Sequence, residues 1–352
     1  MLAALAALAV VALLAACGDT ALLPVSAGTG SRPELPAPQR RLIPTINIAP
    51  ANPWPRGAVP QAAPGLRVAA FANGLDHPRW LLVLPNGDVL VAETNAPPSP
   101  EVATGLKGCL MRLVMQRAGA GAPSANRITL LRDSDSDGDG VADLRSVLIE
   151  GLHSPVGMTL VDDALYVANS DALMRFPYTP GDTRITAPGL HMLALPAGPI
   201  NRHWTKNLIA NADGSKLYVT VGSNSNVGER GIDAEAGRAV IWEVDVKSGE
   251  QRIFALGLVS ALGSILPAAF ANGMFVAEHG SWNRRPHSGY EVGFVPFAAG
   301  VPAALPVDVL SGLLSDDGKA FGRPVGVAID KTGALLVADD VGNTVWRVST
   351  RR

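Results

Sequence analysis

An acidic loop is the segment of this sequence with the most regular pattern of metal-binding residues. Positions 1, 3, 5, 6 and 9 of a calcium loop are filled by Asp135, Asp137, Asp139, Gly140 and Asp143. Alternate carboxylates supply oxygen ligands, and the glycine permits a sharp turn. The usual closing Glu is absent, because Ser146 stands at position 12. The pattern predicts a structural calcium site, with a shifted register from Asp133 or a solvated acidic turn as alternatives.

A histidine beside a tryptophan is a second candidate for chemistry. His203 precedes Trp204 within PAGPINRHWTKN, at residues 196–207, just ahead of an apolar run. A neutral imidazole that faces a cavity there would act as a general base near pH 7. The alternative is a histidine whose hydrogen bonds are made by its own loop.

Arginines and a tryptophan form a third candidate group. The segment EHGSWNRRPHSGY contains Trp282, Asn283 and Arg284, and Arg323 stands in GRPVG. Arginine binds carboxylates through two parallel hydrogen bonds, and tryptophan stacks on flat rings. These residue types predict a planar polyanionic ligand, whereas a Trp282 that merely fills the floor of the domain is the structural alternative.

These candidates stand at the ends of a repeated phrase of two short apolar strands. Five copies occupy residues 77–94, 154–170, 206–223, 269–281 and 323–340. Pairs such as Asn86-Gly87 suit the tight turn between the strands. Repeats of four short strands indicate an all-β fold, a β-propeller, and the length from Leu66 onward has room for about six blades. No segment shows a helical period, and the polar strand ends are expected to meet around a central channel.

The N-terminal part of the chain is predicted to contain a signal peptide and a linker. Residues 1–17 form a lipoprotein signal peptide in this interpretation, because the apolar run before Cys17 is shorter than the roughly 20 residues of a spanning helix. Cys17 is then the lipidated first mature residue, although an ordinary cleaved signal is the alternative. Residues 18–65 are rich in proline and predict a stiff linker, and residues 66–352 form the propeller. We expect a periplasmic or outer-membrane-attached lipoprotein that contacts the membrane only through its lipid.

Composition excludes several other classes of protein. The net charge of −2 provides no basic field for a nucleic-acid partner. Two cysteines cannot form a Cys-based zinc or iron–sulfur site. The sequence also lacks a GxSxG elbow, a Walker A loop and a dinucleotide-binding glycine motif.

Long stretches of the sequence resemble the soluble quinoprotein glucose/sorbosone dehydrogenases, specifically the bacterial L-sorbosone dehydrogenase-like branch. The resemblance runs from about residue 43 to the C-terminus, and it is carried by GLDHPRWLLVLPNGDVLVAETN, LPAGPINRHWTKNL, KLYVTVGSNSNVGE, HGSWNR and GRPVGVA. It implies a six-bladed propeller that binds pyrroloquinoline quinone (PQQ) and calcium. The implied reaction is oxidation of a sugar or sugar aldehyde, with electrons passed to an unknown acceptor.

The resemblance also implies roles for individual residues. His203 matches the base that removes the substrate hydroxyl proton, and Arg323 matches a contact to the quinone carboxylates. Trp282, Asn283 and Arg284 resemble a segment that lines the same site.

The chain departs from the family pattern after Leu258. Family members continue with an Arg-Asn-Pro motif that helps to hold the quinone, followed by a stretch that supplies calcium ligands. Here the chain passes almost directly to Pro267, so roughly a blade is missing, and five blades or a gapped ring are alternatives to six. Two other functions therefore stay open. One is a binding scaffold without catalysis, and the other is a calcium-dependent lactonase or hydrolase that uses Glu93, Asn169, Glu278 and Asp339.

Overall fold

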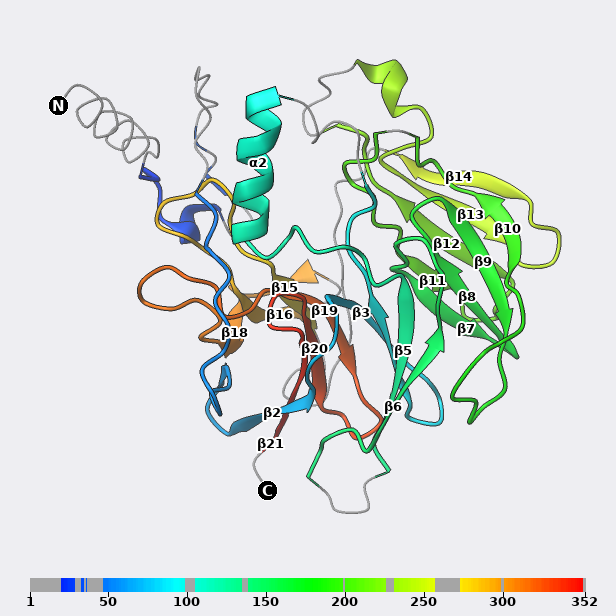
Figure 1. Ribbon diagram of the computed structural model, residues 1–352, viewed down its shortest axis with the longest axis horizontal. Helices are drawn as coiled ribbons and strands as arrows, with labels where there is room; N and C mark the ends of the chain where they lie inside the picture. The colour runs from blue at the N-terminus through cyan, green and yellow to red at the C-terminus, as the bar shows by residue number, and fades with distance from the viewer. Residues whose placement is uncertain are drawn as a thin grey trace.

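The structure is a computed structural model that describes residues 20–28, 33–34, 36, 47–98, 105–134, 139–198, 200–225, 231–256, 273–298 and 301–350. Five antiparallel sheets account for its 21 strands (Figure 1). Their arrangement confirms the predicted all-β propeller. The described residues form five blades, so the estimate of six from length was wrong and the alternative of five was right.

Three blades are each built from four consecutive strands. Blade 1 contains β3 (Pro78–Val83), β4 (Val89–Glu93), β5 (Arg127–Arg132) and β6 (Leu144–Ile149). Blade 2 contains β7 (Met158–Val161), β8 (Ala164–Ala168), β9 (Ala172–Pro177) and β10 (Leu190–Ala194). Blade 3 contains β11 (Leu208–Ala210), β12 (Lys216–Val221), β13 (Val240–Asp245) and β14 (Gln251–Leu256).

The two remaining blades each take a strand from the N-terminal part of the chain. Blade 4 contains β15 (Gly273–Glu278), β16 (Glu291–Ala298), β18 (Val307–Ser311) and β1 (Gln61–Ala62), with β17 (Val301–Pro302) paired to β16. Blade 5 contains β19 (Pro324–Ile329), β20 (Leu335–Asp339), β21 (Thr344–Thr350) and β2 (Leu66–Ala72). Because β2 pairs with β21, the start and the end of the propeller are held in one sheet.

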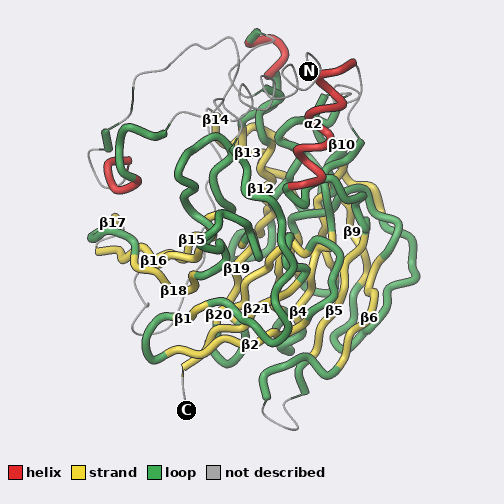
Figure 2. The backbone as a smooth tube through the Cα atoms, turned by 60° about the vertical axis from the view of Figure 1, so that its left-hand side comes forward, coloured by secondary structure: helices red, strands yellow, loops and turns green. Residues whose placement is uncertain are grey.

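The innermost strands run side by side in the order β15, β19, β3, β7 and β11. Separate hydrophobic clusters fill the four junctions that this order creates between neighbouring blades. Every residue of β4, β8 and β20 is buried, because each of these second strands is covered on both faces by adjacent blades. Figure 2 shows the resulting stack of twisted sheets from the side.

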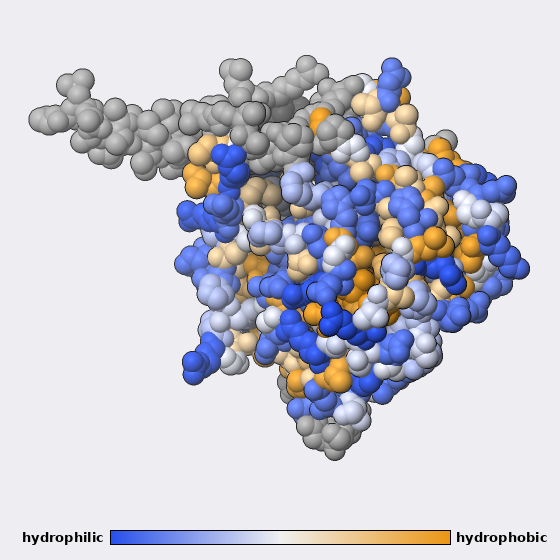
Figure 3. All heavy atoms as spheres, turned by 45° about the vertical axis from the view of Figure 1, so that its right-hand side comes forward, coloured by the Kyte–Doolittle hydropathy of each residue, from blue (hydrophilic) through white to orange (hydrophobic). Residues whose placement is uncertain are grey.

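Blade 3 has one face that no hydrophobic cluster of the described residues covers. Leu217 and Val219 point into the cluster shared with blade 2, so the alternating residues point the other way. On that other face, Phe254 packs edge-on against Tyr218 and is still 51% exposed, and Ile209 is 59% exposed. Figure 3 shows apolar residues gathered between hydrophilic ones on the side formed by blades 2 and 3. The predicted deletion after Leu258 falls outside the described residues.

One α-helix contradicts the expectation that the chain has no helical segment. Helix α2 (Gly105–Arg117) lies between β4 and β5 and projects from the top of the propeller in Figure 1. Cys109, Leu113 and Arg117 share one face at a spacing of four residues, and all three are exposed. A helix without a continuous apolar stripe has no hydrophobic period, so the sequence pattern could not reveal it. The described residues also include the 3₁₀ helices η1 (Val25–Gly28) and η3 (Ile232–Glu235).

Part of the predicted linker lies directly on the propeller. Ala49 is fully buried, and the indole of Trp54 stacks on Phe321 with ring centroids 5.1 Å apart. Trp54 also meets Trp346 of blade 5 edge-on at 5.3 Å. Residues 47–62 therefore pack against blades 4 and 5. Among the described residues, none of the helices is both long enough and apolar enough to span a bilayer.

Candidate functional site at the channel end of the inner strands

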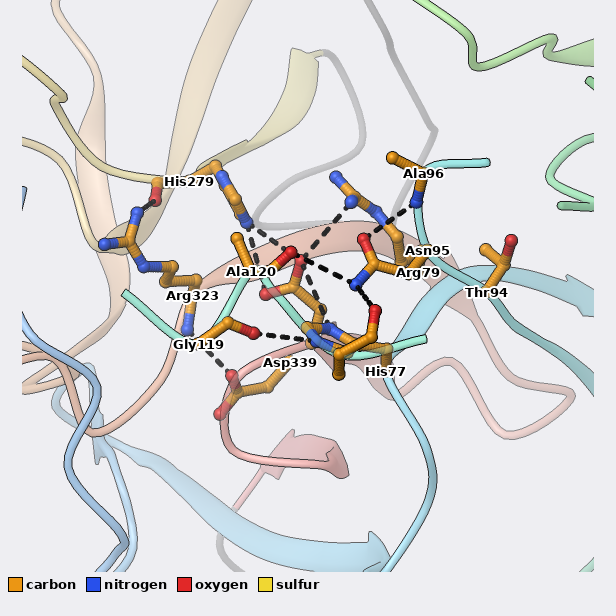
Figure 4. A network of polar contacts seen from close by, with 12 residues as sticks. His77, Arg79, Thr94, Asn95, Ala96, Gly119, Ala120, His279, Arg323 and Asp339 are labelled. Atoms are coloured by element: carbon orange, nitrogen blue, oxygen red, sulfur yellow. Dashed lines mark hydrogen bonds and ion pairs between the residues drawn. The ribbon is translucent and has the colours of Figure 1, made fainter. Parts of the chain in front are cut away.

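A buried carboxylate stands at the centre of the channel end of the propeller. Asp340 directly follows β20, and its side chain is only 3% exposed. Its carboxylate accepts a 3.0 Å hydrogen bond from Nε2 of His279 and lies 3.7 Å from a guanidinium nitrogen of Arg79. Nδ1 of His77 lies 4.0 Å away. Burial opposes ionisation, but His279 and the charge of Arg79 outweigh it and hold the pKa of Asp340 well below its usual range. Figure 4 shows these three side chains converging from two blades.

The histidine on blade 1 has a defined tautomer. Nε2 of His77 lies 2.8 Å from the carbonyl oxygen of Gly119, and because a carbonyl only accepts, Nε2 carries the proton. Nδ1 is buried and has no hydrogen-bond partner among the described residues. Burial lowers the pKa of His77, although the nearby Asp340 acts in the opposite direction. A neutral His77 therefore turns an unprotonated nitrogen toward the Asp340 carboxylate.

Arg323 is close to the channel, but its guanidinium is used within the fold. The residue is 3% exposed, and it donates to the carbonyl oxygens of Ala49 at 3.0 Å and His279 at 3.5 Å. Its guanidinium carbon lies 5.1 Å from the centre of the Tyr290 ring. Nε is buried without a partner among the described residues. Nε of Arg323, the predicted cofactor contact, thus remains available for a ligand. The other two nitrogens of the guanidinium hold the N-terminal segment and blade 4 in place.

The predicted segment Trp282-Asn283-Arg284 is brought to the same region. The carbonyl oxygen of Trp282 accepts the N–H of Asn47 at 2.9 Å, and Asn283 forms a parallel bridge with Asn47. Arg284 donates to the carbonyl oxygen of Leu23 at 2.8 Å, and its Nε is buried without a partner among the described residues. Trp282 and Arg284 are partly buried, and Asn283 is exposed. The N-terminal segment therefore sets the path of this loop.

His203 lies at the start of blade 3 and is exposed. Its Nδ1 is 3.0 Å from the carbonyl oxygen of Ser223 and 2.9 Å from the hydroxyl of the same residue. The carbonyl can only accept, so Nδ1 carries the proton and Nε2 keeps a lone pair. The indole of Trp204 lies 5.6 Å from the guanidinium carbon of Arg79, which joins this region to the Asp340 cluster. The structure thus connects Trp204, the residue after His203, with the buried carboxylate through Arg79.

Lys206 is a feature that the sequence did not single out. Its side chain is fully buried, and Nζ donates to the carbonyl oxygen of Trp204 at 3.2 Å. Burial and the charge of nearby Arg238 lower the pKa of Lys206 to about 7, against a weaker opposite effect of Asp171. His77, Arg79 and Asp340 were missed as well. The sequence could have indicated them only through their position, because HPRW (77–80) and VADD (337–340) lie at the polar ends of the repeated strands.

The acidic loop is not part of this cluster. Asp135 and Asp137 lie outside the described residues, as does Cys17. Asp139 accepts the N–H of Val141 at 2.7 Å, and Asp143 accepts the N–H of Ser134 at 2.8 Å. The loop follows the far end of β5, away from the channel. Within the described ranges, no group of His, Cys, Asp or Glu side chains is arranged to hold a metal ion. Calcium binding by this loop stays a prediction.

Two carboxylates proposed for a lactonase are used for internal contacts. Glu93 is fully buried, and its carboxylate accepts hydrogen bonds from Arg127 at 3.0 and 2.8 Å and from Thr129. Although burial opposes ionisation, these bonds lower the pKa of Glu93. Asp339 accepts bonds from Arg323 and Trp346 of its own blade. Neither carboxylate is therefore presented to a shared metal.

Comparison with solved structures places this fold among known propellers. The PQQ domain of pyranose dehydrogenase from Coprinopsis cinerea gives a TM-score of 0.60 at 18% identity, over 85% of this chain and 98% of that domain. A calcium structure of a carbohydrate-active enzyme of family AA12 from Trichoderma reesei gives 0.59 at 13% identity, over 87% and 99%. The chain has the fold of these propellers. A putative glucose dehydrogenase from Thermus thermophilus gives 0.50 at 17% identity, over 81% of this chain and all of that one.

Sequence comparison reaches only part of the chain. The TrAA12-like family model matches residues 268–351, which contain blade 5 except β2, most of blade 4 and the residues His279, Arg323 and Asp340. An uncharacterised protein of Borreliella burgdorferi is 36% identical over 94 residues, which are 26% of this chain. The match spans about a quarter of the length of that relative. The comparisons therefore show a propeller fold and a TrAA12-like C-terminal part.

Proposed function

We propose that this protein is a PQQ-dependent dehydrogenase of a sugar or sugar aldehyde, of the aldose or sorbosone dehydrogenase type. The observation that carries the proposal is the continuous set of side chains at the channel end. It runs from His203 and Trp204 on blade 3, through Arg79 on blade 1 and Asp340 on blade 5, to His279 on blade 4. Four blades thus supply a base and a group of cations to one place. The fold shared with PQQ-binding propellers supports the same conclusion.

The donor set suits a planar cofactor that carries three carboxylates. Arg79 is 20% exposed and turns one face of its guanidinium toward an indole. Arg284 and Arg323 each have a buried Nε without a partner among the described residues, which an anionic oxygen would satisfy. We assign Arg79, Arg284 and Arg323 to the cofactor carboxylates and Trp282 to its ring. When bound, the quinone supplies a two-electron acceptor for the hydride that leaves the substrate carbon.

His203 is the proposed proton acceptor. Ser223 holds the proton on Nδ1, so Nε2 is free to take the hydroxyl proton of the substrate as the carbon–hydrogen bond breaks. The substrate thereby loses one hydride and one proton, and a hydroxyl-bearing carbon becomes a carbonyl. The proposal includes calcium, which the family pattern implies. It also includes an electron acceptor and a sugar or sugar aldehyde, and it names no particular compound for either.

Titration of the folded, unlipidated protein with PQQ in calcium buffer, followed by tryptophan fluorescence, tests the cofactor. We expect saturable one-to-one binding, weakened at least tenfold by Arg79→Met. Arg175→Met is the matched control, because Arg175 lies on the surface of blade 2 with only a 3.9 Å contact to Asp163. Absence of binding by a protein with a cooperative melting transition would reject the dehydrogenase and favour the scaffold.

Turnover of aldoses and sugar aldehydes with a dye acceptor tests the base. His203→Gln should reduce the rate by a factor of about 10² to 10⁴ and leave PQQ affinity unchanged. An unchanged rate would remove His203 from the proposal.

We also propose that the protein is attached to the cell envelope through Cys17. Incorporation of labelled palmitate that disappears in Cys17→Ser would support the lipid anchor. Incorporation at an equal level in both proteins would contradict it.

A further inference from the structure

A second histidine at the channel end is held by a carboxylate. His279 directly follows β15, and its imidazole is 36% exposed. Nε2 lies 3.0 and 3.2 Å from the two carboxylate oxygens of Asp340. An ionised carboxylate only accepts, so Nε2 carries the proton and the lone pair is on Nδ1. No hydrogen bond to Nδ1 occurs within the described part of the chain.

The charges around this pair keep the carboxylate ionised. Arg79 reaches Asp340 from β3, and Arg323 donates to the carbonyl oxygen of His279 from the start of β19. The adjacent Asp339 points the other way, into blade 5, where it accepts three hydrogen bonds. Among the described residues, His279 both bonds to Asp340 and is substantially exposed, and Figure 4 shows its imidazole directed at this carboxylate.

Two imidazoles from different blades thus present unprotonated nitrogens at one end of the propeller. His203 is held by neutral groups of Ser223, whereas His279 is held by a buried carboxylate. A carboxylate in this position orients the imidazole and stabilises the imidazolium that forms when it takes a proton. Oxidation of a cyclic aldose needs only one base. An aldehyde must first add water, and that step needs a base of its own.

We propose that His279, positioned by Asp340, is the general base that adds water to an aldehyde substrate before the oxidation assigned to His203. Nδ1 takes a proton from water as the water oxygen bonds to the carbonyl carbon. That proton then passes to the former carbonyl oxygen, so a gem-diol forms without net change in charge. Loss of one hydride and one hydroxyl proton from the gem-diol leaves a carboxylic acid. The inference rests on the proposed function and narrows its substrate to aldehydes.

Oxygen exchange tests the hydration step without any cofactor. The protein without PQQ is incubated with glyceraldehyde in ¹⁸O-water, and label in the aldehyde oxygen is followed by mass spectrometry. We expect exchange above the spontaneous rate, reduced at least tenfold in His279→Gln and in Asp340→Asn. The control His191→Gln should retain it, because His191 is exposed on β10 at the outer edge of blade 2. Exchange at the wild-type rate in folded His279→Gln would overturn the inference.

Nitrogen NMR of the same unloaded protein gives a second readout. Long-range ¹H–¹⁵N correlations should show His279 with its proton on Nε2 and, in Asp340→Asn, a changed ratio of tautomers. A proton on Nδ1 in the wild-type protein would contradict the role. PQQ binding in the same samples separates the two proposals. Exchange without PQQ binding would reject the dehydrogenase and support His279 as the hydration base. PQQ binding without exchange would support the dehydrogenase and reject His279 as that base.

Discussion

The main-chain N–H of Arg323 donates a 2.7 Å hydrogen bond to Oδ1 of Asp339. This bond joins the start of β19 to the last residue of β20 at the channel end of blade 5. Oδ1 also accepts the N–H of Gly342 at 2.8 Å, and Oδ2 accepts the indole N–H of Trp346 at 3.0 Å. Asp339 therefore fixes the backbone from which Asp340 reaches the channel.

Removal of this acceptor should destabilise the propeller. In Asp339→Ala, three buried donors lose their partner, and each unsatisfied group costs about 1–3 kcal/mol. We expect the free energy of unfolding in urea to fall by at least about 3 kcal/mol. Gly342→Ala should also be destabilising, because its Cβ would overlap the Asp339 carboxylate. Gly293→Ala is the matched control, since its Cβ would meet Pro306 at an ordinary 3.5 Å. Equal stability of both glycine variants would contradict the assigned contacts.

Lys206 predicts a rise of stability with pH. Its pKa is about 7 in the folded protein and 10.5 in the unfolded chain, so the unfolded chain binds more protons between these values. Stability should therefore increase by about 1.4 kcal/mol per pH unit across the middle of this range. Lys206→Met should lack this contribution, and it should be at least as stable as the wild type at pH 7. Parallel profiles of unfolding free energy from pH 7.5 to 9.5 would contradict a buried lysine.

Glu93 predicts a second rise of stability with pH, in the acid range. Its folded pKa is lowered from 4.5, so its contribution is complete above 4.5 and is lost as the pH falls through the folded value. Glu93→Gln removes the ion pair with Arg127 and should show a shallower loss of stability below pH 4.5. Glu250→Gln is the control, because Glu250 is exposed. If thermal melts of wild type and Glu93→Gln lose stability in parallel, Glu93 does not govern acid unfolding.

The repeated phrase predicted the inner strands well for a physical reason. Four of its five copies coincide with the pairs β3–β4, β7–β8, β11–β12 and β19–β20, which are the strands nearest to the channel. Because the second strands are covered on both faces, their sequences are short continuous apolar runs between turns. The outer strands are half exposed and vary more. The count of six blades failed because helix α2 uses length after Leu66 that the estimate gave to strands.

The site was harder to predict because side-chain direction decides it. Asp339 and Asp340 are adjacent, so alternation places them on opposite sides, but it does not say which one faces the channel. Arg323 was expected to reach a ligand, and one of its terminal nitrogens turns toward the carbonyl oxygen of Ala49, a residue that is far away in sequence. The carbonyl oxygen of Ala49 reaches Arg323 because the N-terminal segment folds onto the propeller, which the sequence pattern around Arg323 does not show. His203 lies in an exposed loop, and its hydrogen-bond partner Ser223 belongs to the same blade.

Gly222 predicts a test of how precisely His203 is placed. It follows β12, and a Cβ there would overlap Cβ of His203 and lie 2.7 Å from its carbonyl oxygen. Gly222→Ala must therefore displace His203 from the hydrogen bonds of Ser223. A displacement of about 1 Å from a reacting group costs on the order of 100-fold in rate. We expect a large loss in kcat and unchanged PQQ affinity in the folded variant, with Gly293→Ala as control. If kcat is preserved although His203→Gln is inactive, the position of the imidazole does not limit turnover, and proton transfer to it is not the slow step.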